Sequence, residues 1–359
     1  MHCINTVKSN ESPKSNESPD LKGLQTSISE SLYWIRGVAI SLVVVGHVIG
    51  FDQSYGMRKL YESDLGLIGA IGDTVSTIHM TTFFIVSGLA TAIFSRPVSR
   101  FQTFFTRKIS RLLIPLVCWA PPFFIFQSLV KGRPVDLFSV VNSVIYPYEI
   151  FWFLHALIFA VTVRYLFEKF QLSDLIYFGF SALLTLLSMH ESLQLSDVYL
   201  FWNGFFALGI VSVRWMYQME ALLQKRKTPV LILGSIVCLV IVTIVSHFLP
   251  VKIYYNVPRL INGIPGFLLF YTTCHLSQRI LQKGVHAAIH SIGALSLVVY
   301  LFHGYFTRLS SIVLAKLPNQ ILPLGYLLIL SVLGIGGPLL LHHFGLKQSR
   351  VLSYVTGGK

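Results

Sequence analysis

The 359-residue chain has few charged side chains and few cysteines. Charged residues make up 12% of it, whereas soluble proteins carry about 25%, and this shortage excludes an ordinary soluble domain. The four cysteines show no metal-ligand spacing, so we expect no metal site and interpret them as small apolar fillers and an inert tail thiol (Cys3, Cys118, Cys238 and Cys274). The chain also lacks a P-loop, a dinucleotide-binding fingerprint and a G-x-S-x-G elbow.

The chain is rich in apolar residues. Hydrophobic residues make up 53% of it, aromatic residues 13%, and the mean hydropathy is +0.66. Such a composition suits helices packed in lipid, with aromatic rings at the interfaces. We therefore predict an all-α, polytopic integral membrane protein.

The first 30 residues differ in kind from the rest. Lys8–Pro13 and Lys14–Pro19 are identical copies of K-S-N-E-S-P, without one large apolar residue. Such a segment cannot bury enough surface to offset its chain entropy. No apolar run follows a basic start, so we do not expect it to be a signal peptide. We predict a disordered cytoplasmic tail over 1–30, a transmembrane domain over 31–346 and a cytoplasmic C-terminal tail over 347–359.

Ten apolar segments can be placed in the remainder at about 20 residues per span. The fifth and sixth are short, with a tight connection at 190–197. The segments lie near 33–51, 75–94, 109–130, 149–168, 172–190, 197–214, 229–250, 258–277, 293–314 and 320–346.

The distribution of basic residues predicts the orientation of these spans. With the N-terminus inside, the inner segments carry 19 of the 28 Lys and Arg and 7 of the 15 acids, and the outer segments carry 8 of each. Together with Arg36, the inner side then holds the whole net charge of +13. Both termini are therefore predicted to be cytoplasmic. We interpret the basic pI of 9.6 as topology and inner-leaflet contact, not nucleic-acid binding.

Arg36 and His47 are the ionisable side chains of the apolar run from Trp34 to Phe51. Eleven residues make about three helical turns, so in a helix both lie on one face, about 16 Å apart along the axis. Ionisable groups inside a membrane helix are costly and usually mark a functional site facing the protein interior. The alternative is a His bonded to a neighbouring helix and an Arg that snorkels to the headgroups; it suits either residue alone better than the pair.

Two inner loops are rich in basic residues. The loop after the sixth segment carries Arg214 and the basic run 225–227, and it indicates an ordinary topogenic cluster. In the other loop, Arg107, Lys108 and Arg111 run straight into the third apolar segment at i, i+3 and i+4 spacing, which gathers them on one surface of a helix. They suit binding of phosphate groups, with Arg as a fork and Lys as a point charge. Positive-inside bias with anionic lipid is the alternative.

Further polar and aromatic groups lie at membrane depth. A lone His or Asn there is more often interhelical glue than a catalyst. Three histidines are predicted on the outer halves of their spans, His47, His79 and His303. These are more than hydrogen bonding between helices would require. The remaining groups are Trp152, His155, Asn203, Asn262 and Tyr300.

These residues resemble a known family. The run from Tyr33 to His47 resembles the R-x10-H first helix of the acyltransferase-three family of membrane O-acyltransferases. Four further stretches look like that family's elements in the same order. His79–Gly88 is similar to H-M-P-L-F-F-x-x-S-G, Arg107–Arg111 to a basic R-x-x-R loop, Trp152–Leu154 to W-F-L, and Ser296–His303 to S-L-x-x-Y-L-x-H.

The chain departs from this pattern in a few places. Tyr33 stands where an acidic residue is frequent, Lys108 where the first Arg of R-x-x-R is usual, and Thr81 where Pro is usual. The chain stops after the tenth segment, so we expect no extracytoplasmic hydrolase-like domain of the kind that longer members carry.

The resemblance implies a multi-pass enzyme of the bacterial inner membrane. It implies transfer of an acyl group, usually acetyl, from cytoplasmic acyl-coenzyme A to a hydroxyl of an envelope saccharide such as an O-antigen or capsule. His47 is then the base or acyl carrier, and Arg36 and the basic loop (Arg107, Lys108 and Arg111) hold the coenzyme A phosphates. Acceptor binding or oxyanion stabilisation is expected of His79, Trp152, Tyr300 and His303. The expected partners are lipid, acyl-coenzyme A and saccharide, with no metal and no nucleic acid.

Two other classes of function stay open from the sequence. A transporter or flippase for a charged or glycosylated metabolite would use Arg36 and His47 as a substrate or proton-relay site. Against it, the chain shows no internal repeat of helices and no matching pair of broken helices. A structural scaffold explains the Arg–His pair least well.

Overall fold

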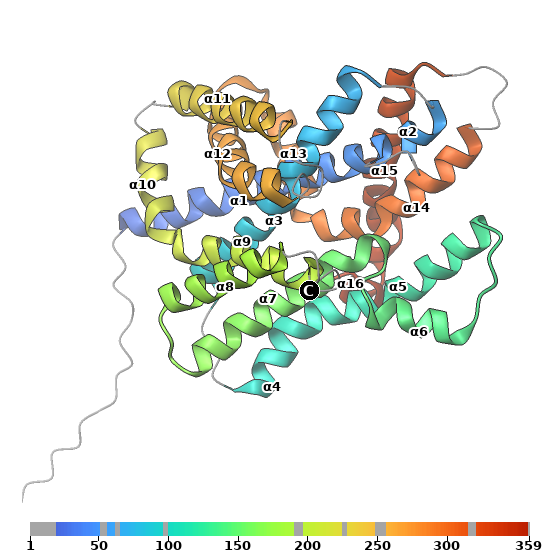
Figure 1. The fold of residues 1–359 in the computed structure, drawn as a ribbon, viewed down its shortest axis with the longest axis horizontal. Coiled ribbons are helices and arrows are strands. Elements are labelled where there is room, and N and C mark those ends of the chain that lie inside the picture. Colours follow the sequence, from blue (N-terminus) through green and yellow to red (C-terminus); the bar gives the residue numbers. More distant parts are fainter. Residues whose placement is uncertain are drawn as a thin grey trace, which may run out of the picture.

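The computed structural model describes residues 19–50, 56–61, 65–95, 100–189, 197–224, 228–247, 256–314 and 321–357. Over these residues the secondary structure is helical, with no strand (Figure 1). The all-α prediction is confirmed. The helices are α1 Pro19–Ile49, α2 Gly56–Tyr61, α3 Leu67–Phe94, α4 Phe101–Phe104, η1 Phe105–Ile109, α5 Ser110–Val130, α6 Leu137–Ile145, η2 Glu149–Phe151, α7 Trp152–Lys169, α8 Asp174–Ser188, α9 Asp197–Val211, α10 Val213–Gln224, α11 Thr228–His247, α12 Asn256–Ile280, α13 Lys283–Ala294, α14 Ser296–Leu314, α15 Pro323–Phe344, η3 Leu346–Gln348 and α16 Arg350–Val355.

Six helical stretches of the described chain are long and apolar enough to cross a membrane. A seventh is counted if α9 and α10, which meet at a bend of 62°, form one broken span. Each of the ten predicted apolar segments coincides with a helix over its described residues, but α8 and α9 have only 15 residues each. The count of ten and the orientation of the termini therefore stay predictions. The six stretches are Gly23–Ile49, Leu67–Phe94, Phe101–Val130, Leu137–Lys169, Ser296–Leu314 and Pro323–Gln348.

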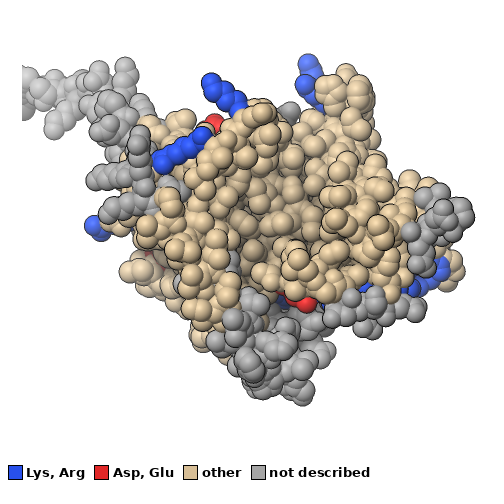
Figure 2. Space-filling view, turned by 90° about the horizontal axis from the view of Figure 1, so that it is seen from above, with Lys and Arg blue, Asp and Glu red and all other residues tan. Residues whose placement is uncertain are grey.

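The surface has the charge pattern of a membrane protein. In the view of Figure 2, Lys and Arg side chains lie at the margins of the described surface. A broad area between them carries neither basic nor acidic side chains. Such a belt suits the hydrocarbon layer, where unpaired charges are costly.

Helix α1 is the central element of the bundle. It packs against α3, α12, α13, α14 and α15, which come from both ends of the sequence (Figure 1). Helix α3 in turn packs against α9 and α12. Most side chains in the C-terminal half of α1 are therefore buried or half-buried against other helices.

Helix α1 crosses α13 at very short range through two glycines. A Cβ added to Gly293 would lie 1.7 Å from the carbonyl oxygen of Tyr33, and one added to Gly37 would lie 2.1 Å from that of Ile289. Only glycine lets the two backbones approach this closely. The crossing lies beside Arg36 and fixes the rotation of α1 there.

Parts of both predicted tails belong to the folded structure. Helix α1 begins at Pro19, so residues 19–30, predicted to be disordered, are helical. Packing explains the difference, since Ile28 is fully buried and Ser27 donates a 2.6 Å hydrogen bond to Glu220. Near the C-terminus, Trp119 Nε1 donates to the carbonyl of Val355 at 3.0 Å. Residues 1–18, with most of the K-S-N-E-S-P repeat, lie outside the described residues.

Candidate active site

His47 and His303 lie in ring contact although 256 positions separate them in the sequence. Their ring centroids are 5.2 Å apart, His47 on α1 and His303 on α14. His303 is fully buried, and its Nδ1 contacts the carbonyl oxygens of Tyr300 at 2.8 Å and Val299 at 3.1 Å. A carbonyl only accepts hydrogen bonds, so Nδ1 carries the proton and Nε2 keeps the lone pair. Within the described residues, this buried Nε2 has no hydrogen-bond partner.

His79 on α3 is the third histidine of this group. Its Nδ1 lies 2.5 Å from the carbonyl oxygen of Val75, so the same argument places the proton on Nδ1 and the lone pair on Nε2. The ring is buried and lies within electrostatic range of His47. Three imidazoles from α1, α3 and α14 therefore meet in one region of the protein interior.

Aromatic rings continue from this group toward α9. Tyr300 packs at 6.3 Å from His303 and at 5.3 Å from Phe153. Trp152, the neighbour of Phe153 on α7, lies 5.2 Å from Trp202. The Tyr300 hydroxyl donates a hydrogen bond to the carbonyl of Ile150, which fixes the ring against the start of α7. Tyr300 and Trp152 are thus two members of one continuous aromatic layer.

Arg36 lies on the same face of α1 as His47, about 16 Å away along the axis. Its side chain is half-buried, and its guanidinium sits 5.9 Å from the ring centroid of Tyr33. The described part of the chain offers Arg36 no carboxylate within ion-pair distance. The guanidinium thus keeps the planar fork that binds phosphate or carboxylate groups.

The basic loop residues are arranged differently from a single surface patch. Arg107 and Lys108 lie in the π-helix η1, and Arg111 lies in the first turn of α5. Arg107 and Arg111 are exposed, whereas Lys108 is half-buried and lies within electrostatic range of Glu168 and Arg164 on α7. A π-turn changes the rotation per residue, so the i, i+4 spacing of an α-helix does not hold here.

Comparison with known proteins decides the family. A family model described as an acyltransferase domain matches residues 29–343, and so spans most of the chain. The chain belongs to the acyltransferase-three family. No curated protein and no solved structure matches it. With its apolar helices, this makes the protein a multi-pass membrane acyltransferase.

Arg259 is a residue of this acyltransferase that the sequence patterns did not single out. It lies in the first turn of α12, with its guanidinium 5.9 Å from the ring centroid of Trp202. It also lies within electrostatic range of His79. One turn along α12, Asn262 donates a 3.1 Å hydrogen bond to Thr77 on α3. The spacing of Arg259 and Asn262, three residues apart, is the signal in the sequence that places both on one helix face.

The other polar groups at membrane depth have mainly structural surroundings. Asn203 donates to Ser181 at 2.9 Å and accepts from Tyr177 at 3.3 Å, which joins α9 to α8. This is the interhelical glue expected of membrane amides. His155 packs 6.3 Å from Tyr199. Over the described chain, no group of three or more His, Cys, Asp or Glu side chains is placed to hold a metal ion.

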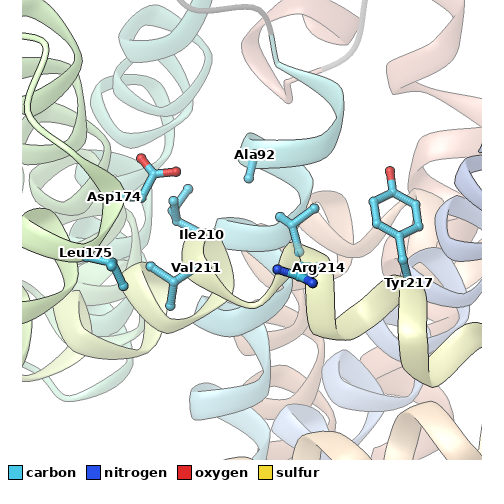
Figure 3. A pocket seen from close by; sticks show the side chains of 8 residues that line it. Ala92, Asp174, Leu175, Ile210, Val211, Arg214 and Tyr217 are labelled. Carbon is cyan, nitrogen blue, oxygen red and sulfur yellow. The ribbon is translucent and has the colours of Figure 1, made fainter. Parts of the chain in front are cut away.

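A cavity of about 540 Å³ opens away from the histidines, where α3, α8, α9 and α10 meet (Figure 3). Its walls combine apolar side chains with Asp174, Arg214 and Tyr217. In Figure 3, Asp174 and Leu175 lie at one end of the cavity and Tyr217 at the other, with Arg214 between them. None of the residues in the predicted site lines this cavity.

Proposed function

We propose that this acyltransferase moves an acetyl or other short acyl group from cytoplasmic acyl-coenzyme A to a hydroxyl of an envelope saccharide, with His47 as general base, in a bacterial inner membrane. The observation that carries the proposal is that two imidazoles, from α3 and α14, meet His47 on the face of α1 that also bears Arg36. A donor held near Arg36 and an acceptor held near His79 and His303 would meet at His47.

The reaction needs one base and no redox step. The acceptor hydroxyl attacks the thioester carbonyl carbon while His47 takes the hydroxyl proton. A C–O bond forms, the C–S bond of the tetrahedral intermediate then breaks, and coenzyme A leaves as a thiolate. The imidazolium of His47 returns its proton to that sulfur. An imidazole suits this exchange because it gains and loses a proton near neutral pH.

The main-chain hydrogen bonds of His79 and His303 favour one of their two predicted roles. With Nδ1 protonated, each neutral ring offers only a lone pair at Nε2. A lone pair accepts a hydrogen bond from a sugar hydroxyl but cannot stabilise an oxyanion. The Tyr300 hydroxyl donates to Ile150, so its proton is also engaged. We therefore assign these residues and Trp152 to acceptor binding rather than to the oxyanion hole.

Donor binding is assigned to Arg36, about 16 Å along α1 from His47, and to the basic residues of η1 and α5. Arg36 offers a half-buried fork, and Arg107 and Arg111 offer exposed ones. Charge-assisted hydrogen bonds from guanidinium to phosphate are among the strong ones, which suits the coenzyme A phosphates. Lys108 contributes less to phosphate binding, because the nearby Glu168 carboxylate already offsets part of its positive charge.

Release of free coenzyme A by purified protein tests the proposal. In lipid nanodiscs with acetyl-coenzyme A, thiol should appear only when an envelope saccharide is added, and mass spectrometry should find an acetyl increment on that saccharide. A transporter would carry the saccharide without releasing thiol. Absence of both thiol and acetylated product, across envelope saccharides with free hydroxyls, would contradict the proposal.

A further inference from the structure

The cavity between α3, α8, α9 and α10 is an open hollow with room for a ligand and a few polar groups in its walls. Its volume, about 540 Å³, lies within the range of about 300–1,000 Å³ usual for small-molecule pockets. Ala92, Ile210 and Val213 supply apolar walls, and Arg214 and Tyr217 supply a cation and an aromatic ring. A few polar groups in an apolar hollow are typical of cofactor sites.

The two residues with recognition chemistry are presented together by α10. Arg214 and Tyr217 are three positions apart on one helix, so they share a face. Arg214 is exposed and Tyr217 is half-buried. The bend of 62° between α9 and α10 turns this face over the cavity (Figure 3).

A buried carboxylate holds α10 in this position. Glu220 is fully buried and accepts hydrogen bonds from Ser27 on α1 at 2.6 Å and from Tyr271 on α12. Its Oε2 also lies 3.0 Å from Nε2 of His275. Since Glu220 follows Tyr217 by three residues, these contacts fix the turn of α10 that carries the ring.

An ion pair connects the edge of the cavity with the surroundings of Lys108 in the basic segment. Asp174 at its edge is bonded to Arg164 at 2.6 Å, and Arg164 lies within electrostatic range of Lys108. Along α3, Ala92 at the cavity and His79 near the imidazoles are 13 residues apart, or about 20 Å in a helix. A long flexible arm is needed to connect the two places.

We propose that this cavity binds the adenine nucleotide of the acyl-coenzyme A donor, with the base against Tyr217 and one phosphate on Arg214. The remaining phosphates of coenzyme A are left to the basic residues assigned to the donor above. The assignment rests on the proposed function and locates the donor within it. Apolar walls alone would suit a lipid chain, whereas a ring and a guanidinium on one helix face suit a planar base that carries a phosphate. The pantetheine arm then runs along α3 toward His47.

Titration calorimetry with protein in nanodiscs tests this assignment, with acetyl-coenzyme A, adenosine 3′,5′-bisphosphate and adenosine as probes. Wild-type protein should bind the first two. Arg214→Gln should weaken binding of the bisphosphate about tenfold and leave the weak binding of adenosine unchanged, because a charge-assisted hydrogen bond is lost. Tyr217→Leu should weaken binding of both the bisphosphate and adenosine. Tyr217→Phe should retain binding of both because it keeps the ring.

The control is Lys283→Gln, which removes an exposed cation outside the cavity at the start of α13 and should change no affinity. Unchanged bisphosphate binding in Arg214→Gln and Tyr217→Leu, with wild-type melting temperatures, would overturn the assignment while leaving the proposed function standing. A loss that follows only the content of anionic lipid would assign the cavity to a headgroup and also overturn it. Failure of wild-type protein to bind acetyl-coenzyme A would instead contradict the proposed function.

Discussion

Two histidines of the site are held by main-chain carbonyls one turn earlier in their own helices. His79 is bonded to Val75, and His303 to Val299 and Tyr300. This local bonding fixes ring orientation and tautomer without an acidic partner. It explains how these two imidazoles are held in a fixed orientation by their own helices, α3 and α14.

The role of Arg36 depends on geometry rather than on charge alone. Arg36→Lys keeps the positive charge and any headgroup contact but removes the planar fork. We expect activity to fall about tenfold or more, since charge-assisted hydrogen bonds contribute about 1.5–3 kcal/mol. Transfer assays in membranes, normalised to the amount of protein, measure it. Wild-type activity in Arg36→Lys would reduce this residue to an interfacial anchor.

Arg259 is expected to act on the acceptor side. Its guanidinium lies over Trp202 and near His79, so its donors can reach oxygen atoms of a saccharide held against the aromatic layer. Arg259→Gln should raise KM for the saccharide about tenfold with little change in KM for acetyl-coenzyme A. Arg133→Gln, which removes an exposed cation before α6, is the matched control. Equal effects of the two substitutions on the saccharide KM would show a general charge effect only.

At the scale of elements, the crossing of α1 and α13 sets the position of the active-site helix. The backbones meet at Gly37 and Gly293, directly beside Arg36. Helix α13 was not predicted as a separate element, because Lys283–Ala294 mixes polar and apolar residues and merges with the ninth apolar segment. The contact is visible only once both backbones are placed.

A single methyl group tests this crossing. Gly293→Ala places a Cβ against the Tyr33 carbonyl and should lower the unfolding free energy by about 1–3 kcal/mol, the usual cost of overpacking. Gly284→Ala on the same helix meets nothing within 4 Å and should be neutral or slightly stabilising because alanine favours helix. Thermal unfolding in detergent compares them. Equal melting temperatures for the two variants would mean that α13 is free to shift away from α1.

At the scale of the whole molecule, the sequence predicts elements that have a periodic pattern, but it does not predict contacts between residues far apart in the chain. Apolar runs located the long helices. The buried cluster around Glu220 was missed, because Glu220 reads as one more acid in an inner loop and its partners Ser27 and Tyr271 lie far away in sequence. The helical start at Pro19 was missed for the same reason, since packing of Ile28 rather than composition orders it.

The sequence identifies the main residues of the candidate site but not how they meet. Spacing alone placed Arg36 and His47 on one face of α1. No spacing relates His47 to His303, which the fold brings into ring contact. Arg259 and Trp202 carry no pattern that connects them before α9 and α12 are packed on α3.

The central claim is that His47 is the general base when an acyl group passes from a cytoplasmic donor to a saccharide on the other side of the membrane. One experiment tests this claim directly. Inverted membrane vesicles expose the cytoplasmic face, so acetyl-coenzyme A is added outside and the saccharide is trapped inside. Wild-type protein should acetylate the trapped saccharide. His47→Ala, at equal protein amount, should lose at least about a hundredfold of this rate, because general-base catalysis contributes about 10²–10⁴. Acetylation at the wild-type rate by His47→Ala would contradict the account.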